Sequence, residues 1–99
     1  MKHEQDIIKW AEDKNLADET NSRNQLIKLF EEAGELCAAE LKGDHEKVID
    51  SIGDCLVVLT IYAHSKGLNI DKCITHAWNE IKDRRGKTEN GIFKRHLHD

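Results

Sequence analysis

Five acidic side chains near the middle of the chain have the types and spacing of a metal-binding site. Three of them, Glu31, Glu32 and Glu35, lie within little more than one helical turn. At roughly 100° per residue they share one sector of a helix, and apolar residues fill most of the remaining arc. Like charges at i and i+4 disfavour a helix, and neighbouring apolar burial raises the cost unless a cation neutralises them.

A second acidic pair stands on the next predicted helix. Asp50 and Asp54 are four residues apart and directly precede the most apolar stretch, residues 55–63. Asp is a poor helix former, so two on one face of a buried helix indicate a function. Carboxylate oxygens are hard ligands that suit Mg²⁺ or Mn²⁺. We therefore predict a Mg²⁺ site, with Mn²⁺ as the second choice, whose candidate carboxylates are Glu31, Glu32, Glu35, Asp50 and Asp54.

Iron and zinc sites are disfavoured by the sequence. A di-iron bundle uses Glu-x-x-His on its helices, and no histidine here stands three residues after a glutamate. The three cysteines show no zinc-ligand spacing. An ordinary solvated acidic face remains the alternative, although the neighbouring apolar sequence on both helices argues against it.

A basic segment supplies the complementary charge. Lys82 and Arg85 are separated by three residues, so both can reach one anion if the segment is helical. Cations near a helix C-terminus also have an ordinary explanation in the helix dipole. Carboxylates with a metal opposite Lys and Arg side chains are typical of phosphoryl chemistry.

Four helices must position these residues. Hydrophobic periodicity and capping signals predict them over about residues 2–13, 22–42, 45–66, and from 69 or 71 to 85. Ser22 and Gln25 have capping-box spacing, Gly43 ends the second helix, and Asp44 caps the third. If the second and third helices pack antiparallel through this short connection, the two acidic sectors face each other. The tail, residues 86–99, shows no clear period and is expected to be irregular.

The predicted fold is all-α, a four-helix bundle-like single domain over residues 1–99. Residues 55–63 are apolar on every side of their helix, which one small chain can hardly cover, so we expect a homodimer or homotetramer. The net charge of −4 offers no basic track for nucleic acid. We also expect no membrane segment and, by default, a cytoplasmic location, since no apolar run approaches the roughly 20 residues of a membrane span.

The order of these motifs resembles a known family. Residues 25–36, with Glu31, Glu32 and Glu35, resemble the EExxE motif of the MazG-like, all-α nucleoside triphosphate pyrophosphohydrolases. Residues 51–59 resemble the following ExxD motif, and residues 79–85 its Asn/Lys/Arg segment. One position departs from the pattern, because Ser51 stands where the family has a glutamate.

The resemblance implies hydrolysis of a nucleoside triphosphate to the monophosphate and pyrophosphate with Mg²⁺. It implies that Glu32, Glu35 and Asp54 bind metal and that Glu31 orients or deprotonates the attacking water. Asp50 is the neighbouring acid that can replace the one missing at position 51.

The resemblance also implies substrate contacts. Phosphate would be neutralised by Lys28, Lys82 and Arg85, and Asn79 would hydrogen-bond sugar or phosphate. Gln25 has two interpretations, the capping partner of Ser22 or a nucleotide contact. Trp10 is interpreted either as a core residue or as a platform on which a base stacks.

Two alternatives to this function remain open. One is a non-catalytic helical interaction module that binds a nucleotide or metal, which the serine at position 51 would permit. The other is a phosphoribosyl-ATP pyrophosphohydrolase-like enzyme, a relative that uses similar carboxylates on a similar bundle. A panel of substrates separates these hypotheses.

Overall fold

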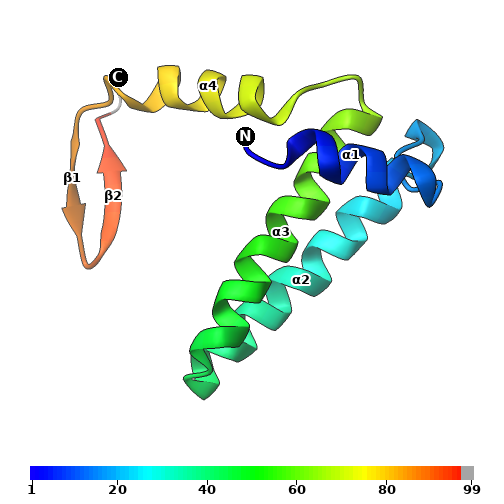
Figure 1. Cartoon of the computed structure of the whole chain (residues 1–99). Coiled ribbons are helices and arrows are strands. Elements are labelled where there is room, and N and C mark those ends of the chain that lie inside the picture. Colours follow the sequence, from blue (N-terminus) through cyan, green and yellow to red (C-terminus); the bar gives the residue numbers. More distant parts are fainter. Residues whose placement is uncertain (97–99) are drawn as a thin grey trace.

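The structure, a computed structural model, describes residues 1–96 of the chain; residues 97–99 of the predicted irregular tail lie outside the described part. Four α-helices and a two-stranded antiparallel sheet follow one another along the described chain (Figure 1). Their bounds are α1 Glu4–Asp13, α2 Ser22–Lys42, α3 His45–Ser65, α4 Ile70–Ile81, β1 Gly86–Glu89 and β2 Ile92–Arg95, with a short 3₁₀ turn, η1, at Glu19–Asn21. The all-α class is confirmed.

Helices α2 and α3 form a long antiparallel hairpin (Figure 1). Gly43 ends α2 with a φ of 68°, a left-handed conformation in which glycine is not strained. Asp44 then caps α3, its Oδ1 accepting a hydrogen bond from the backbone N–H of Lys47 at 3.1 Å. Both predicted signals are confirmed, and this two-residue connection sets the register between the two acidic sectors.

Helix α1 lies across the end of this hairpin and packs against α3 (Figure 1). The side chains that this packing buries completely are small. Thr60 and Ser51, both on α3, are the largest fully buried side chains among residues 1–96. Within that range the buried hydrophobic residues are Ile8, Ala11, Ala39, Val58, Ile61 and Ala63. One chain therefore encloses only a narrow core.

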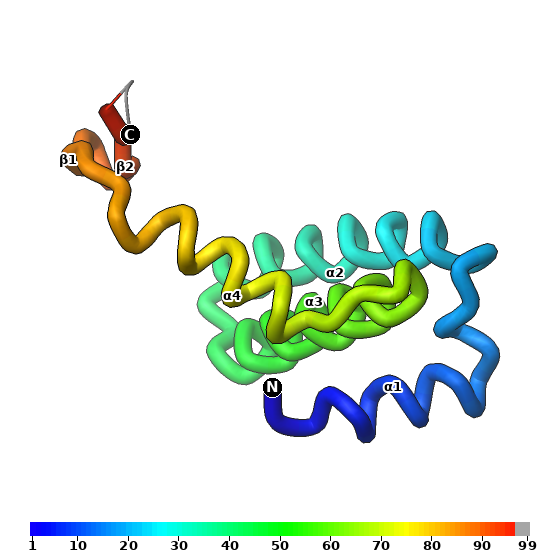
Figure 2. Tube along the Cα trace, turned by 90° about the horizontal axis from the view of Figure 1, so that it is seen from above, coloured from blue at the N-terminus to red at the C-terminus, as the bar shows by residue number. Residues whose placement is uncertain are grey.

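Helix α4 leaves the end of α3 sideways and carries the two strands away from the other helices (Figures 1 and 2). Asn69, one of the two predicted starts, caps it, its Oδ1 accepting from the backbone N–H groups of Asp71 and Lys72. The helix ends at Ile81, before the predicted residue 85, and none of its residues is buried. The radius of gyration, 16.1 Å, exceeds the about 13 Å of a compact domain of this length.

The prediction of an irregular tail is wrong for residues 86–95. Gly86 pairs with Arg95 and Glu89 with Ile92 in an antiparallel ladder. The turn between the strands is Asn90-Gly91, and both residues have positive φ, 52° and 77°. An Asn-Gly dipeptide in this conformation is the strongest short-range hairpin signal, and it stands in the sequence.

The burial expected for α3 is not reached within one chain. Ile52 and Leu56 are 47% and 43% exposed, although the stretch that follows packs against α1 and α2. By length and composition alone, α3 also qualifies as a membrane span, contrary to the expectation from the sequence. That test is a weak indicator, because core helices pass it too. Apolar side chains of α3 and α4 therefore stay exposed within one chain.

Candidate active site

Three of the five predicted carboxylates converge on one point between α2 and α3. One oxygen atom from each of Glu32, Glu35 and Asp54 lies within 4.8 Å of the others. Glu32 is buried on α2 and Glu35 is exposed on the same helix. Asp54, also exposed, reaches them from α3 because the short connection aligns the two helices. Among residues 1–96 this is the group of acidic, histidine or cysteine side chains with a metal-binding arrangement.

The surroundings of Glu32 suit a cation. Its side chain is 9% exposed, and its Oε1 lies 3.3 Å from Lys28 Nζ. Its second oxygen, Oε2, is buried and has no hydrogen-bond partner. A buried carboxylate oxygen without a partner is costly. A hard divalent cation shared with Glu35 and Asp54 would satisfy it, so these three side chains fit such an ion.

A soft thiol ligand does not compete at this point. Burial raises the pKa of the Cys55 thiol, and the nearby carboxylates of Glu32 and Asp54 raise it further. The Cys55 thiol is not one of the side chains whose ligand atoms converge at this point. The donor set consists of carboxylates alone, which favours Mg²⁺ or Mn²⁺ over zinc.

The remaining acidic candidates lie outside this cluster. Glu31 is 61% exposed and its Oε2 lies 3.4 Å from Lys28 Nζ. Asp50 is exposed on α3 and is not a member of the three-carboxylate group. Ser51, in the position of the family's missing glutamate, is fully buried, and its Oγ has no hydrogen-bond partner. A buried hydroxyl therefore stands where the family has its fourth acid, and Asp50 does not take that acid's place in the cluster.

A cavity of about 400 Å³ opens beside the carboxylates. Glu32 and Asp54 line one part of it, and three residues predicted to bind substrate, Trp10, Gln25 and Lys28, also line it. Trp10 is 48% exposed, so its interpretation as a core residue is wrong. The ring lies under Lys14, whose Nζ is 5.4 Å from its centroid. An aromatic surface, an amide and an ammonium group thus share one cavity with the metal-binding carboxylates.

The capping role of Gln25 is not formed. Ser22 is the first residue of α2 and not its N-cap, because the 3₁₀ turn at Glu19–Asn21 leads directly into the helix. Asn21 occupies the N-cap position without a side-chain capping bond. Gln25 is 6% exposed and makes no side-chain hydrogen bond to any residue in 1–96. Its amide is therefore available to the cavity that it lines.

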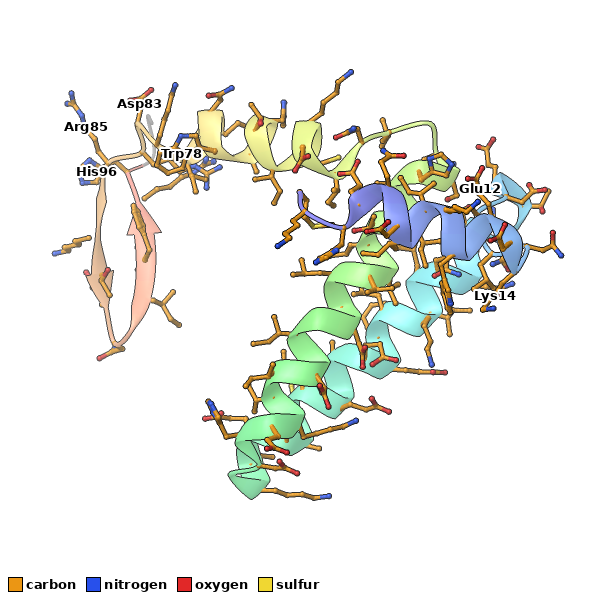
Figure 3. All side chains as sticks on the ribbon, viewed as in Figure 1. Glu12, Lys14, Trp78, Asp83, Arg85 and His96 are labelled. Carbon is orange, nitrogen blue, oxygen red and sulfur yellow. The ribbon has the colours of Figure 1, made fainter. Side chains whose placement is uncertain are left out.

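The basic segment is not brought to the carboxylates within one chain. Asn79 is on α4, Lys82 caps its end, and Arg85 precedes β1. None of the three lines the cavity. Figure 3 shows Arg85 at the opposite side of the molecule from Lys14, which covers the Trp10 ring. Within one chain, this segment therefore does not contact the site.

Several residues that line the cavity were not predicted. They are Leu16, Asn21, Asn24, Val57, Val58 and Ile61. Their spacing along the helices could have identified them. On α2 and its N-cap the lining residues stand at positions 21, 24, 25, 28 and 32, and on α3 at 54, 57, 58 and 61. Each series follows the i, i+3, i+4 spacing of one helix face, extended from the acidic motif toward α1.

Comparison with known proteins identifies the family to which the chain belongs. The sequence profile of the family described as phosphoribosyl-ATP pyrophosphohydrolase matches residues 3–95. A stretch of 57 residues is 49% identical to the uncharacterized 18.2 kDa protein in the rep-hol intergenic region of Haemophilus phage HP1 (strain HP1c1). This stretch covers 58% of the present chain and 35% of the phage protein, so the chain spans about a third of that relative's length. No solved structure matches. Because the profile covers nearly the whole chain, the chain belongs to the phosphoribosyl-ATP pyrophosphohydrolase family, part of the MazG-like all-α nucleoside triphosphate pyrophosphohydrolase superfamily.

Proposed function

We propose that this chain is a Mg²⁺-dependent nucleoside triphosphate pyrophosphohydrolase, with Mn²⁺ as a substitute metal. The family indicates pyrophosphohydrolase activity on nucleotides. The observation that carries the finer proposal is the convergence of Glu32, Glu35 and Asp54 beside a cavity of about 400 Å³. In the reaction, the oxygen of water bonds to phosphorus, the bond between the first and second phosphates breaks, and pyrophosphate and the nucleoside monophosphate are released.

Each carboxylate has a part in this proposal. Glu32, Glu35 and Asp54 would hold the metal, since their oxygens already lie within 4.8 Å of one another. When bound, a divalent cation supplies a water of lowered pKa and neutralises phosphate charge. Glu31 would orient this water or accept its proton, because it stands next to Glu32 and is exposed to solvent. Asp50 would act at most through a water, from outside the cluster.

The nucleotide would lie along α2. Lys28 is four residues before Glu32, so its ammonium group can contact phosphates held at the carboxylates. Gln25 and Trp10 continue the cavity away from the carboxylates and would contact the nucleoside. The carboxylates and Lys28 would therefore face the phosphates, and Gln25 and Trp10 would face the sugar and the base.

A second copy of the chain would complete the site. The exposed apolar residues of α4, including Ile74 and Trp78 at 62% and 57% exposure, need a partner surface. The exposed apolar residues of α2 and α3 offer one, and the acidic cluster lies beside it. Association of α4 with another copy would bring Asn79, Lys82 and Arg85 toward that copy's carboxylates. We therefore propose a homodimer, or a homotetramer built from such dimers.

The cavity favours a nucleoside triphosphate over phosphoribosyl-ATP. The latter carries a further phosphate on its phosphoribosyl group, at the base end of the molecule. Lys28 is the one cation among the residues that line the cavity, and it stands at the carboxylate end. A second phosphate at the base end would meet Trp10, Leu16 and two asparagines. The cation beside them, Lys14, does not line the cavity, and its Nζ lies over the Trp10 ring, 5.4 Å from the centroid.

The test is pyrophosphate release from a panel of ribo- and deoxyribonucleoside triphosphates and phosphoribosyl-ATP, with Mg²⁺, Mn²⁺ or EDTA. We expect metal-dependent release of pyrophosphate from one or more nucleoside triphosphates. Turnover of phosphoribosyl-ATP alone would overturn the substrate assignment. Orthophosphate as the first product would indicate a phosphatase. A folded protein that releases nothing from any of these compounds would favour the non-catalytic binding module.

A further inference from the structure

The side-chain amides at the base end of the cavity form a relay whose orientation is determined by a backbone carbonyl. The carbonyl oxygen of Leu16 can only accept, so Asn21 must present its Nδ2 to it, at 3.2 Å. Asn21 Oδ1 then accepts a hydrogen bond from Asn24 Nδ2 at 2.7 Å. Turning either amide over would place two oxygens or two N–H groups against each other. Asn24 is therefore left with Oδ1 as its unused acceptor.

This oriented amide stands at a defined distance from the carboxylates. Asn24 and Glu32 both line the cavity, eight residues apart on α2. A helix rises about 1.5 Å per residue, which places their backbones about 12 Å apart along the axis. The ribose and first phosphate of a nucleotide can bridge this separation. A phosphate at the carboxylates would thus leave the base beside Asn24, Trp10 and the buried amide of Gln25.

We propose that Asn24 determines base preference: its Oδ1 accepts a hydrogen bond from an N–H group on the edge of the nucleobase, in an orientation held by Asn21. Asn21 is a positioning residue in this arrangement, because it acts through Asn24. Trp10 supplies the apolar surface beside the base. The inference rests on the proposed function for the identity of the ligand, yet it concerns binding of the nucleoside and not hydrolysis.

The experiment measures binding with Mg²⁺ present, so that the phosphate is held at the carboxylates, and without turnover, because nucleoside monophosphates are products of the proposed reaction. Trp10 fluorescence is followed in a Trp78→Phe background while each of the four deoxynucleoside monophosphates is added. Ribose 5-phosphate serves as the probe without a base. We expect Asn24→Ala to weaken binding of the preferred nucleotides about three- to tenfold, as for loss of one neutral hydrogen bond. The ranking of the four bases should flatten, and the affinity for ribose 5-phosphate should not change. Arg23→Ala, next to Asn24 on α2, is the matched control.

The positioning role of Asn21 has its own test. If Asn21 acts only through Asn24, then Asn21→Ala flattens the base ranking, and the double variant Asn21→Ala/Asn24→Ala is no worse than Asn24→Ala. Additive losses would show an independent contact and overturn the relay.

Outcomes for base recognition and for hydrolysis are separable. Unchanged affinities and ranking in Asn24→Ala overturn the inference, as does a wild type whose Trp10 responds to no nucleotide, even if it releases pyrophosphate. Nucleotide binding that depends on Asn24 in a protein without turnover supports the inference and rejects the proposed function.

Discussion

Lys28 Nζ lies 3.3 Å from Glu32 Oε1, one helical turn further along α2. The contact neutralises one oxygen of a nearly buried carboxylate and leaves the other, Oε2, without a partner. Lys28 therefore has two relations to the site. It stabilises Glu32 in the absence of metal, and its ammonium group remains at the edge of the cavity, where phosphate would bind.

The pair predicts a defined pH dependence of stability. Hydrogen bonds to Glu32 and then Glu31 raise the pKa of Lys28 above its ordinary value of 10.5. Because the pKa is raised in the folded state, the charged Lys28 contributes to the free energy of unfolding. This contribution is fully present below pH 10.5 and is lost as the pH rises through the higher folded-state pKa. The difference in unfolding free energy between wild type and Lys28→Met should be constant from about pH 7 to about pH 10 and shrink above that. A difference that persists unchanged at about pH 12 would show that Lys28 acts by packing.

Removing charge from the cluster should separate function from stability. Glu35→Gln and Asp54→Asn are expected to reduce pyrophosphate release at least a hundredfold. Without metal, their melting temperatures should equal or exceed that of wild type, because repulsion among the carboxylates is relieved. The exposed pair of Glu35 with Lys47, at 3.8 Å, offsets less than about 1 kcal/mol of this gain. Glu40→Gln on α2 is the control. Loss of metal-free stability in both site variants would make these residues structural.

Metal binding should itself be measurable as stabilisation. An ion at a hundred times its dissociation constant stabilises the folded state by about 2.7 kcal/mol, which is roughly 10 °C or more for a chain of this size. We expect Mg²⁺ and Mn²⁺ to raise the melting temperature of wild type and EDTA to reverse it. Asp54→Asn should respond much less. Equal shifts in both proteins would place the metal elsewhere.

Ser51 offers a sharp contrast between two substitutions. Its side chain is fully buried and its Oγ is unpaired, so Ser51→Ala should leave stability unchanged or raise it by up to about 1 kcal/mol. Ser51→Glu, which restores the family's acid, should destabilise the metal-free protein by several kcal/mol. Because the new carboxylate adds a ligand, Mg²⁺ should recover more stability in Ser51→Glu than in wild type. Thermal melts with and without Mg²⁺ decide this, and a Ser51→Glu protein as stable as wild type without metal would show that the position opens to solvent.

A shared site predicts complementation between inactive variants. If Lys82 of one copy serves the carboxylates of another, Glu35→Gln and Lys82→Ala each inactivate every site of a homodimer. Their random mixture contains heterodimers with one intact site each, so about a quarter of wild-type activity should return. Mixing Glu35→Gln with Asp54→Asn is the control and should return nothing, because both changes fall in the same chain's half. Equal recovery of activity in the two mixtures would contradict a site shared between two chains. Light scattering reports the oligomeric state of each sample.

The hairpin of α2 and α3 was predictable because its signals are local. Gly43 and Asp44 mark the ends of two helices, and helical periodicity then places Glu32, Glu35 and Asp54 on facing sides. The position of Lys82 was not predictable in this way. Its own helix was identified, but the direction that α4 takes after α3 depends on packing that one chain does not provide. Local sequence patterns thus predict that a helix forms. They do not predict where a helix such as α4 lies when few of its contacts are within the same chain.

Two predictions are wrong for specific physical reasons. The hairpin at Asn90 and Gly91 escapes a search for periodicity because four-residue strands carry too little alternation, although the turn residues themselves are diagnostic. The capping box at Gln25 has the right spacing from Ser22, yet the 3₁₀ turn before α2 moves the N-cap back to Asn21.

The two-residue connection at Gly43 and Asp44 makes the site sensitive to insertions far from its chemistry. A longer loop there would leave both helices and their caps intact. It would also free α3 to slide or rotate against α2, and a rotation of one residue is about 100°. Asp54 would then leave Glu32 and Glu35 without any catalytic residue having changed. In natural variation of this chain, length at that connection should be as strictly maintained as the acids themselves, while loops elsewhere on the molecule are free to grow.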